Sequence, residues 1–163
     1  MKRKLILLIL ILFLTVSCVF AGETVLKVGI SIDKVPKELY GTWRVTSKLV
    51  SSNNQEIFKP DSVDLWNLSR SNNVITLDNP FSGAHASIIL DEVTDKVIKF
   101  KKIGDYDNKK LTDTVQLILS KETFTGVNYL KLDTISEVDG HVIKSENATY
   151  RLTGEKISGA SIK

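Results

Sequence analysis

The sequence has very little of the chemistry that cysteine and histidine provide. Its single cysteine, Cys18, lies in an N-terminal segment that reads as an export signal. The domain after that segment therefore has no disulfide, no thiolate nucleophile and no cysteine-ligated metal. The two histidines, His85 and His141, have no ligand-type residue two or four positions later, so no local metal site is formed. We expect no metal, no cofactor and a fold that depends on core packing alone.

Residue patterns typical of catalytic sites are also missing. There is no Gly-x-Ser-x-Gly turn to present a nucleophile, and no pair of titratable groups stands out. The loop that contains Asp105, Asp107 and Asn108 is rich in oxygens, but Lys109 and Lys110 follow and the bidentate glutamate of a calcium loop is absent. The sequence therefore predicts a protein that is not an enzyme.

The chain after its N-terminal segment has no excess of charge of either sign. The formal net charge of +3 comes entirely from Lys2, Arg3 and Lys4, so residues 22–163 are formally neutral. A neutral chain with both signs interspersed has no electrostatic footprint for nucleic acid or for an anionic membrane surface. We expect no nucleic-acid partner.

The N-terminal segment has the parts of a secretory signal. Lys2–Lys4 is the charged region, and Leu5–Val16 is an apolar run shorter than the roughly 20 residues of a membrane-spanning helix. The sequence thus predicts an exported protein, periplasmic, envelope-bound or secreted, with no transmembrane segment in its mature chain.

Two processing routes fit this signal. Cleavage after Ala21 would leave a signal peptide of residues 1–21 and a mature chain that begins at Gly22. Alternatively, residues 15–18 (Thr-Val-Ser-Cys) resemble a bacterial lipobox, which would make Cys18 the lipidated first residue and a membrane anchor. Export is expected by either route.

Alternation with a period of two and frequent turn residues dominate the rest of the chain, and no stretch has sustained helical periodicity. Because Val63 and Leu65 share one face and Trp66 the other, we expect a β-bulge there, and a second at Gly126. The expected strands are Thr42–Ser52, Ser62–Ser69, Val74–Leu77, Gly83–Val93, Val97–Ile103, Leu111–Ser120, Thr123–Glu137 and His141–Leu152.

About eight strands joined by short loops indicate an all-β fold, and residues 41–163 form one domain. A short turn of helix is expected at Pro36–Leu39, an Asp-Gly hairpin turn at Asp139-Gly140, and an end to the last strand at residues 153–155. The leader, residues 22–40, is open to two interpretations. Its first part, residues 22–33, alternates enough to form an extra edge strand, but it equally fits an extended leader.

The stretch Gly41-Thr42-Trp43 at the start of the first strand resembles that of the lipocalin-like (calycin) barrels. The resemblance implies an antiparallel up-and-down barrel in which Trp43 packs at the closed end, crossed by a basic side chain from near the last strand. Arg151 is the first candidate for that cation and Lys156 the second, and such a pair is worth about 0.5–2 kcal/mol. Gly104 replaces the threonine of the lipocalin turn motif and the C-terminal helix is missing. The chain therefore resembles compact bacterial lipocalin-like domains rather than the classical family.

Two functions follow from such a barrel. An eight-stranded interior is either filled by side chains or able to hold one small ligand. In the first hypothesis the barrel binds a small hydrophobic or amphipathic molecule, with Trp66 and Tyr129 as the aromatic contacts. In the second the barrel is ligand-free and acts through its outer surface on a protein partner that the sequence does not identify. A large interior cavity would favour the first, and a packed interior with an exposed apolar patch the second.

Overall fold

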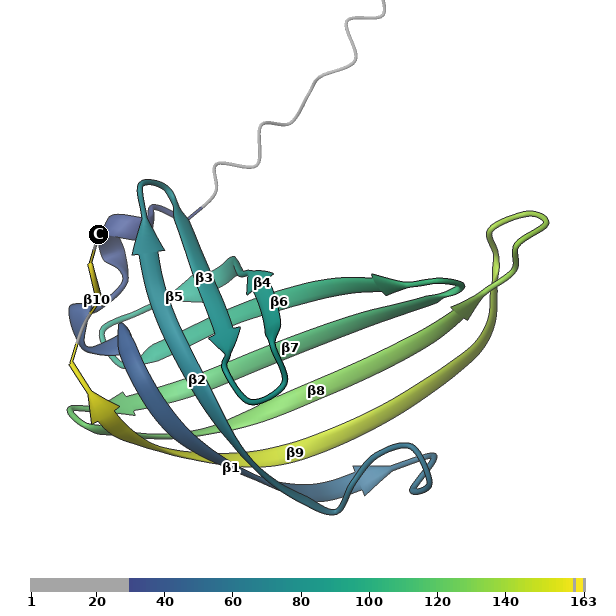
Figure 1. The fold of residues 1–163 in the computed structure, drawn as a ribbon, viewed down its shortest axis with the longest axis horizontal. Helices are drawn as coiled ribbons and strands as arrows, with labels where there is room; N and C mark the ends of the chain where they lie inside the picture. Colours follow the sequence, from purple (N-terminus) through teal and green to yellow (C-terminus); the bar gives the residue numbers. More distant parts are fainter. Residues whose placement is uncertain (1–29, 160, 163) are drawn as a thin grey trace, which may run out of the picture.

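A computed structural model describes residues 30–159 and the backbone of residues 161–162, and these residues are almost entirely antiparallel β-structure (Figure 1). The expected signal segment, Cys18 and residues 22–29 lie outside the described residues. The strands are β1 (Gly41–Ser52), β2 (Asp61–Ser71), β3 (Val74–Asn79), β4 (Ala84–Ser87), β5 (Ile89–Val93), β6 (Val97–Tyr106), β7 (Lys109–Ser120), β8 (Thr123–Ile135), β9 (Val142–Ser158) and β10 (Ser161–Ile162).

Nine strands form a nearly closed barrel in the order β4-β3-β2-β1-β9-β8-β7-β6-β5. This confirms the expected antiparallel barrel, with one strand more than predicted because the expected strand Gly83–Val93 is divided at Ile88. The first half, β4, pairs with β3, and the second half, β5, pairs with β6. The Ile88 N–H donates to the Ile75 carbonyl at 2.9 Å. One bent segment thus carries the chain between the two edges of the sheet, and short β10 adds to β2 in parallel.

The expected bulge at Trp66 was wrong. The pairing of β1 with β2 is in continuous register from Gly41↔Leu68 to Lys48↔Asp61. Trp66 points inward and is 6% exposed, whereas Val63 is 60% exposed on the outer face. An apolar residue on the outer face produces the same sequence pattern as a bulge.

The expected roles of two glycines were also wrong. The pairing of β7 with β8 runs through Gly126 without a shift, and β9 continues through Gly154 to Ser158. A Cβ at Gly126 would lie 2.4 Å from the Gln116 carbonyl oxygen, and one at Gly154 would lie 2.2 Å from the Phe124 ring. Both glycines therefore mark places of close approach within continuous strands.

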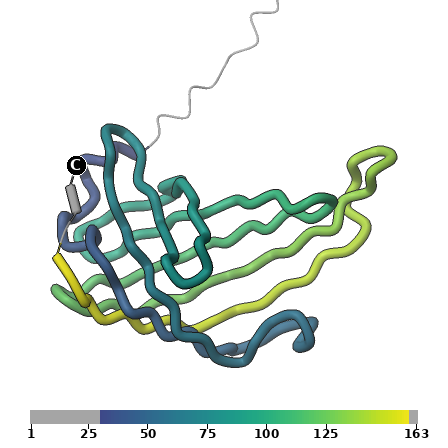
Figure 2. Tube along the Cα trace, in the orientation of Figure 1, coloured from purple at the N-terminus to yellow at the C-terminus, as the bar shows by residue number. Residues whose placement is uncertain are grey.

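One end of the barrel is closed by the segment before β1, which contains two short 3₁₀ helices, η1 (Ile32–Lys34) and η2 (Lys37–Leu39). Figure 2 shows this segment and the end of β9 together at the left, whereas the β1–β2 loop and the β8–β9 hairpin lie at the other end. The helical turn expected at Pro36–Leu39 is confirmed. Leu39 and Tyr40 are buried, and the Trp43 indole N–H donates to the Leu39 carbonyl at 2.8 Å.

Candidate functional site

The inward-facing residues change from apolar to polar along the barrel axis. At the closed end Trp43 packs against Phe124, with ring centroids 5.1 Å apart, and Phe124 stacks on Trp66 at 6.1 Å. The neighbouring inward positions Phe100 and Val115 are fully buried. This half of the interior is filled with side chains, and Trp66 is the last aromatic ring of the stack.

The cation over Trp43 comes from Lys156 and not from Arg151. The Lys156 Nζ lies 5.1 Å from the centre of the Trp43 ring and donates to the Glu38 carbonyl at 2.6 Å. Burial lowers the pKa of Lys156. Arg151 is exposed because its position in β9 points outward. The error arose from ending β9 too early, since the strand's extension beyond Leu152 brings Lys156 back to the inner face.

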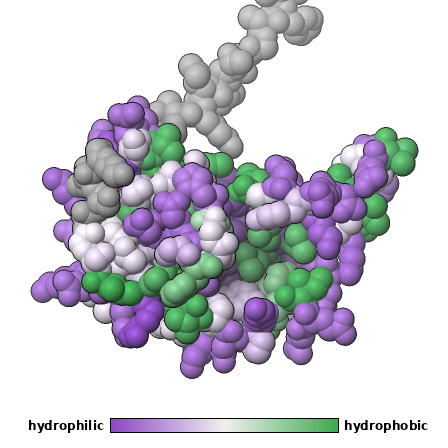
Figure 3. Space-filling model, viewed as in Figure 1, coloured by the Kyte–Doolittle hydropathy of each residue, from purple (hydrophilic) through white to green (hydrophobic). Residues whose placement is uncertain are grey.

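Beyond Trp66 the barrel interior contains a cavity of about 370 Å³. Figure 3 shows this side of the molecule hollowed, with hydrophobic residues inside and hydrophilic residues around them. The size falls within the range of small-molecule sites. The cavity is lined by Ser47, Ile57, Phe58, Lys59, Ser62, Asp64, Trp66, Leu77, Asn79, Ala84, Lys102, Asp113, Asn128, Leu130 and Tyr150.

Six of these residues give the cavity a polar layer: Asp64, Asn79, Lys102, Asp113, Asn128 and Tyr150. Lys102 of β6 forms an ion pair with Asp113 of β7 at 2.7 Å, and its Nζ lies 5.6 Å from the centre of the Trp66 ring. Asn128 of β8 donates from Nδ2 to Asp113 Oδ1 at 2.8 Å. The two oxygens of Asp113 are thus held by two different strands.

One polar atom of this layer has no partner among the described residues. Asn128 is 7% exposed, and its Oδ1 accepts no hydrogen bond. Its amide orientation follows from the donation of Nδ2 to Asp113. An unsatisfied buried acceptor costs about 1–3 kcal/mol, and this atom itself has almost no accessible surface.

The opposite wall of the cavity carries Asp64 of β2. Asn79 of β3 donates to Asp64 Oδ1 at 3.2 Å, and the Ser62 hydroxyl lies 3.4 Å from Asp64 Oδ2. Tyr150 of β9 donates its hydroxyl to the Lys59 carbonyl at 3.0 Å, and burial raises the pKa of this phenol. This wall therefore presents a carboxylate whose partners in the described structure are neutral.

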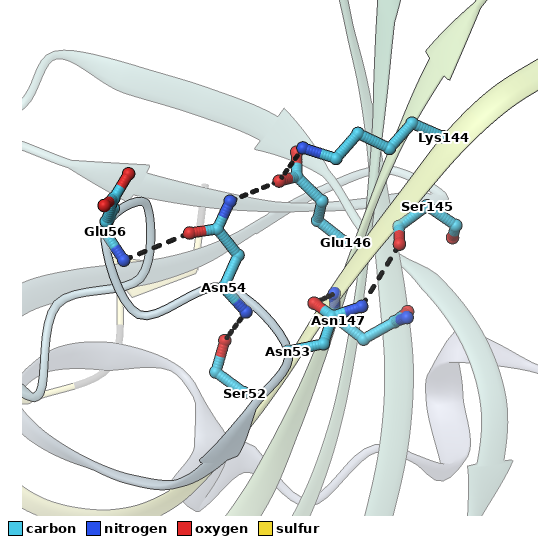
Figure 4. A network of polar contacts seen from close by, with 8 residues as sticks. All are labelled: Ser52, Asn53, Asn54, Glu56, Lys144, Ser145, Glu146 and Asn147. Carbon is cyan, nitrogen blue, oxygen red and sulfur yellow. Dashed lines mark hydrogen bonds and ion pairs between the residues drawn. The ribbon is translucent and has the colours of Figure 1, made fainter.

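A hydrogen-bond network holds the β1–β2 loop against β9 at the open end (Figure 4). Asn53 pairs with Asn147, donating from its N–H to the Asn147 carbonyl at 3.1 Å and accepting from the Asn147 N–H at 2.8 Å. Glu146 is buried and accepts from the Asn54 amide and from Lys144. The hydrogen bonds from Lys144 and Asn54 lower the pKa of Glu146. This network positions the loop that contributes Phe58 and Lys59 to the cavity.

A seam in the barrel wall lies next to the polar layer. Strand β4, at one end of the strand order, comes close to β6, the second strand from the other end, without forming a ladder with it. A smaller hollow of about 120 Å³ lies there, and Ala84, Lys102 and Asp113 line both this hollow and the main cavity. The polar layer is thus adjacent to the least paired part of the wall.

The structure separates the two predicted aromatic contacts. Trp66 lines the cavity, whereas Tyr129 is 49% exposed on the outer face of β8, between the inward Asn128 and Leu130. Tyr129 therefore does not line the cavity. Sequence reasoning missed Lys102, Asp113 and Asn128. Each occupies an inward position of an alternating strand, and a polar residue in such a position was the available signal.

The remaining polar groups singled out in the sequence lie elsewhere. His85 contacts Asp78, and His141 Nδ1 lies 2.5 Å from Asp139 Oδ1, with both imidazoles exposed. Within residues 30–159, no group of three or more His, Cys, Asp or Glu side chains is arranged to hold a metal ion. A hollow of about 310 Å³ lies outside the closed end, beside Lys156 and Glu38. Lys156 is already committed to Trp43 and to Glu38 there, so the interior cavity is the better candidate site.

No protein-family model, curated protein or solved structure matches the chain. None of the helices in the described part of the chain has the length and apolar character needed to cross a membrane.

Proposed function

We propose that the protein is a non-catalytic barrel that binds a small amphipathic molecule in the open half of its interior. The observation that carries this proposal is the cavity of about 370 Å³ above Trp66, whose lining contains an ion pair and a second carboxylate. The other half of the interior is filled. A barrel that needed only stability would gain more from apolar side chains in both halves.

The closed end supports the resemblance to lipocalin-like barrels. Trp43 lies at the start of the first strand with a basic side chain across its ring, as that resemblance implies, although the cation is Lys156. Export rests on the N-terminal pattern alone, and Cys18 lipidation remains the alternative processing route.

A second function is favoured by a different surface. The β8–β9 hairpin exposes Val138, Val142 and Ile143, with 95%, 48% and 61% of each side chain's surface accessible. An apolar tip on a projecting hairpin (Figure 1) suits contact with a protein partner. In this alternative the barrel acts through its outside as an envelope or secreted interaction module.

Native mass spectrometry of the full chain, expressed in bacteria and purified without detergent, tests the first proposal. We expect a bound small mass that is lost on denaturation. The matched variants are Ser47→Phe and Thr46→Phe, because Ser47 lines the cavity and Thr46 faces the outer surface of the same strand. Ser47→Phe should remove the bound mass, and Thr46→Phe should retain it.

A bare mass that stays bare after incubation with a lipid and metabolite extract would contradict the proposal. Retention of the ligand by Ser47→Phe would place binding outside the cavity and favour the hairpin surface.

A further inference from the structure

We propose that the molecule bound in the cavity carries a cationic amine, and that Asp64 is its counter-ion. This inference rests on the proposed function and adds the chemical class of the ligand. It follows from the charges and the hydrogen-bonding capacity of the polar layer.

The cavity lining contains two lysines and two aspartates, but only one pair of them is in contact. Lys102 is paired with Asp113, with 19% and 11% of their side-chain surfaces exposed, so these two charges cancel locally. Among the residues that the structure describes, no Lys, Arg or His side chain forms an ion pair with Asp64. Lys59 contributes a carbonyl that accepts from Tyr150, and the residue itself is exposed. The cavity wall therefore carries one negative charge whose neighbours are neutral donors.

The hydrogen bonds of the polar layer lead to the same conclusion. The Asn128 and Asn79 amide groups donate to Asp113 and Asp64, and the Tyr150 hydroxyl donates to a backbone carbonyl. Each amide group has donated one of its two hydrogens, whereas the Asp64 carboxylate accepts only from neutral groups and retains free lone pairs. A carboxylate without a cationic partner is complementary to a ligand that brings donors, and an ammonium group brings three with a positive charge.

The rest of the cavity suits an organic body of modest size. Trp66, Phe58, Leu77 and Leu130 supply apolar surface. The Lys102 ammonium already lies over the Trp66 ring. A second cation would thus be held by the carboxylate of Asp64 rather than by the aromatic face.

Three probes that share a phenylethyl body separate the possibilities: 2-phenylethylamine, 2-phenylethanol and 3-phenylpropanoate. Isothermal titration calorimetry at low ionic strength should show the amine binding at least about tenfold more tightly than the alcohol, and the carboxylate binding weakest. Asp64→Asn should remove about tenfold of the amine's affinity and leave the alcohol's affinity within about twofold.

Two further variants serve as controls. Asp61→Asn removes a carboxylate from the exposed start of the same strand and should leave the amine's affinity unchanged. Asp64→Glu keeps the charge and should retain the preference for the amine even if packing is altered. Circular dichroism should show native β-structure in every variant used.

The outcomes distinguish this inference from the proposed function. Equal binding of all three probes, tightest binding of the carboxylate, or an unchanged amine affinity in Asp64→Asn would overturn the inference and leave a binding barrel. A co-purified ligand without a cationic group would overturn it as well. Failure of every probe, with no co-purified mass, would contradict both proposals.

Discussion

The two halves of the barrel interior are built from different kinds of residue. The closed half holds Trp43, Phe124 and Phe100 at or near zero exposure, with Gly154 leaving the space that the Phe124 ring occupies. The open half holds an ion pair, a second carboxylate and a cavity of about 370 Å³. One half is filled for stability, and the other contains polar groups that burial alone would disfavour.

This contrast separates the residues that maintain the fold from those that serve a ligand. Polar groups inside a barrel cost desolvation energy, which their mutual interactions offset only in part. Departures from optimal packing are expected where a protein functions. The changes below test whether the two halves respond as this division requires.

The largest effect is expected from Trp43→Ala in the closed half. Removing a fully buried indole, with its hydrogen bond to Leu39, should lower the free energy of unfolding by about 3–5 kcal/mol. Urea denaturation followed by circular dichroism measures this loss. Tyr129→Ala, on the outer face, is the control and should change stability by less than about 0.5 kcal/mol. A loss below about 1 kcal/mol for Trp43→Ala would mean that the closed half is not the main core.

A smaller effect is expected from Lys102→Met in the open half. This change leaves Asp113 without its cation, and because both side chains retain slight exposure the loss should be about 2–3 kcal/mol. The neighbouring Lys101→Met breaks an outer ion pair with Asp91 and should cost less than about 1 kcal/mol. If the two variants lose the same free energy of unfolding in urea titrations, the inner ion pair contributes no more to stability than the outer one.

The fold class was visible in the sequence, whereas the division of the interior into two halves was not. The alternation predicted an all-β fold, and the resemblance carried by Gly41-Thr42-Trp43 implied the antiparallel barrel that is observed. The strand count and the cation were missed for local reasons, because Ile88 bends one apparent strand into two and β9 continues through Gly154.

The polar layer was harder to predict because its six members come from six different strands. Lys102, Asp113 and Asn128 meet only through the pairing of β6 with β7 and of β7 with β8. Tyr129 was predicted as a contact because it is aromatic, but the residue beside it, Asn128, has the inward position. Strand parity was a better guide than residue type.

An intermediate loss of stability is expected when the cation at the closed end, Lys156, is removed. Lys156→Met keeps most of the side-chain volume but removes the charge over Trp43 and the hydrogen bond to Glu38. A loss of about 0.5–2 kcal/mol is expected in thermal or urea unfolding. Arg151→Met should have no comparable effect, since Arg151 points outward. If Arg151→Met lost more unfolding free energy than Lys156→Met, Arg151 rather than Lys156 would be the cation that stabilises the closed end.

The smallest effect is expected at the rim, and it depends on pH. Because hydrogen bonds lower the folded-state pKa of Glu146 below the ordinary value of 4.5, its stabilisation is fully present above that pH. The stabilisation is lost as the pH falls through the lower folded pKa. The difference in Tm between the protein and its Glu146→Gln variant should therefore be constant from pH 6 to 8 and shrink in acid. A difference that grows in acid would contradict the sign of the pKa shift, and Glu56→Gln is the exposed control.

The most direct test of the division between the two halves replaces the polar centre of the open half. The triple variant Lys102→Met, Asp113→Leu, Asn128→Leu removes the ion pair and the partnerless acceptor together. We predict a free energy of unfolding equal to or above that of the parent protein, with loss of the bound small mass in the native spectrum. A variant less stable by more than about 2 kcal/mol would show that these three residues serve the fold, and one that still carries the ligand would show that they are not needed for binding.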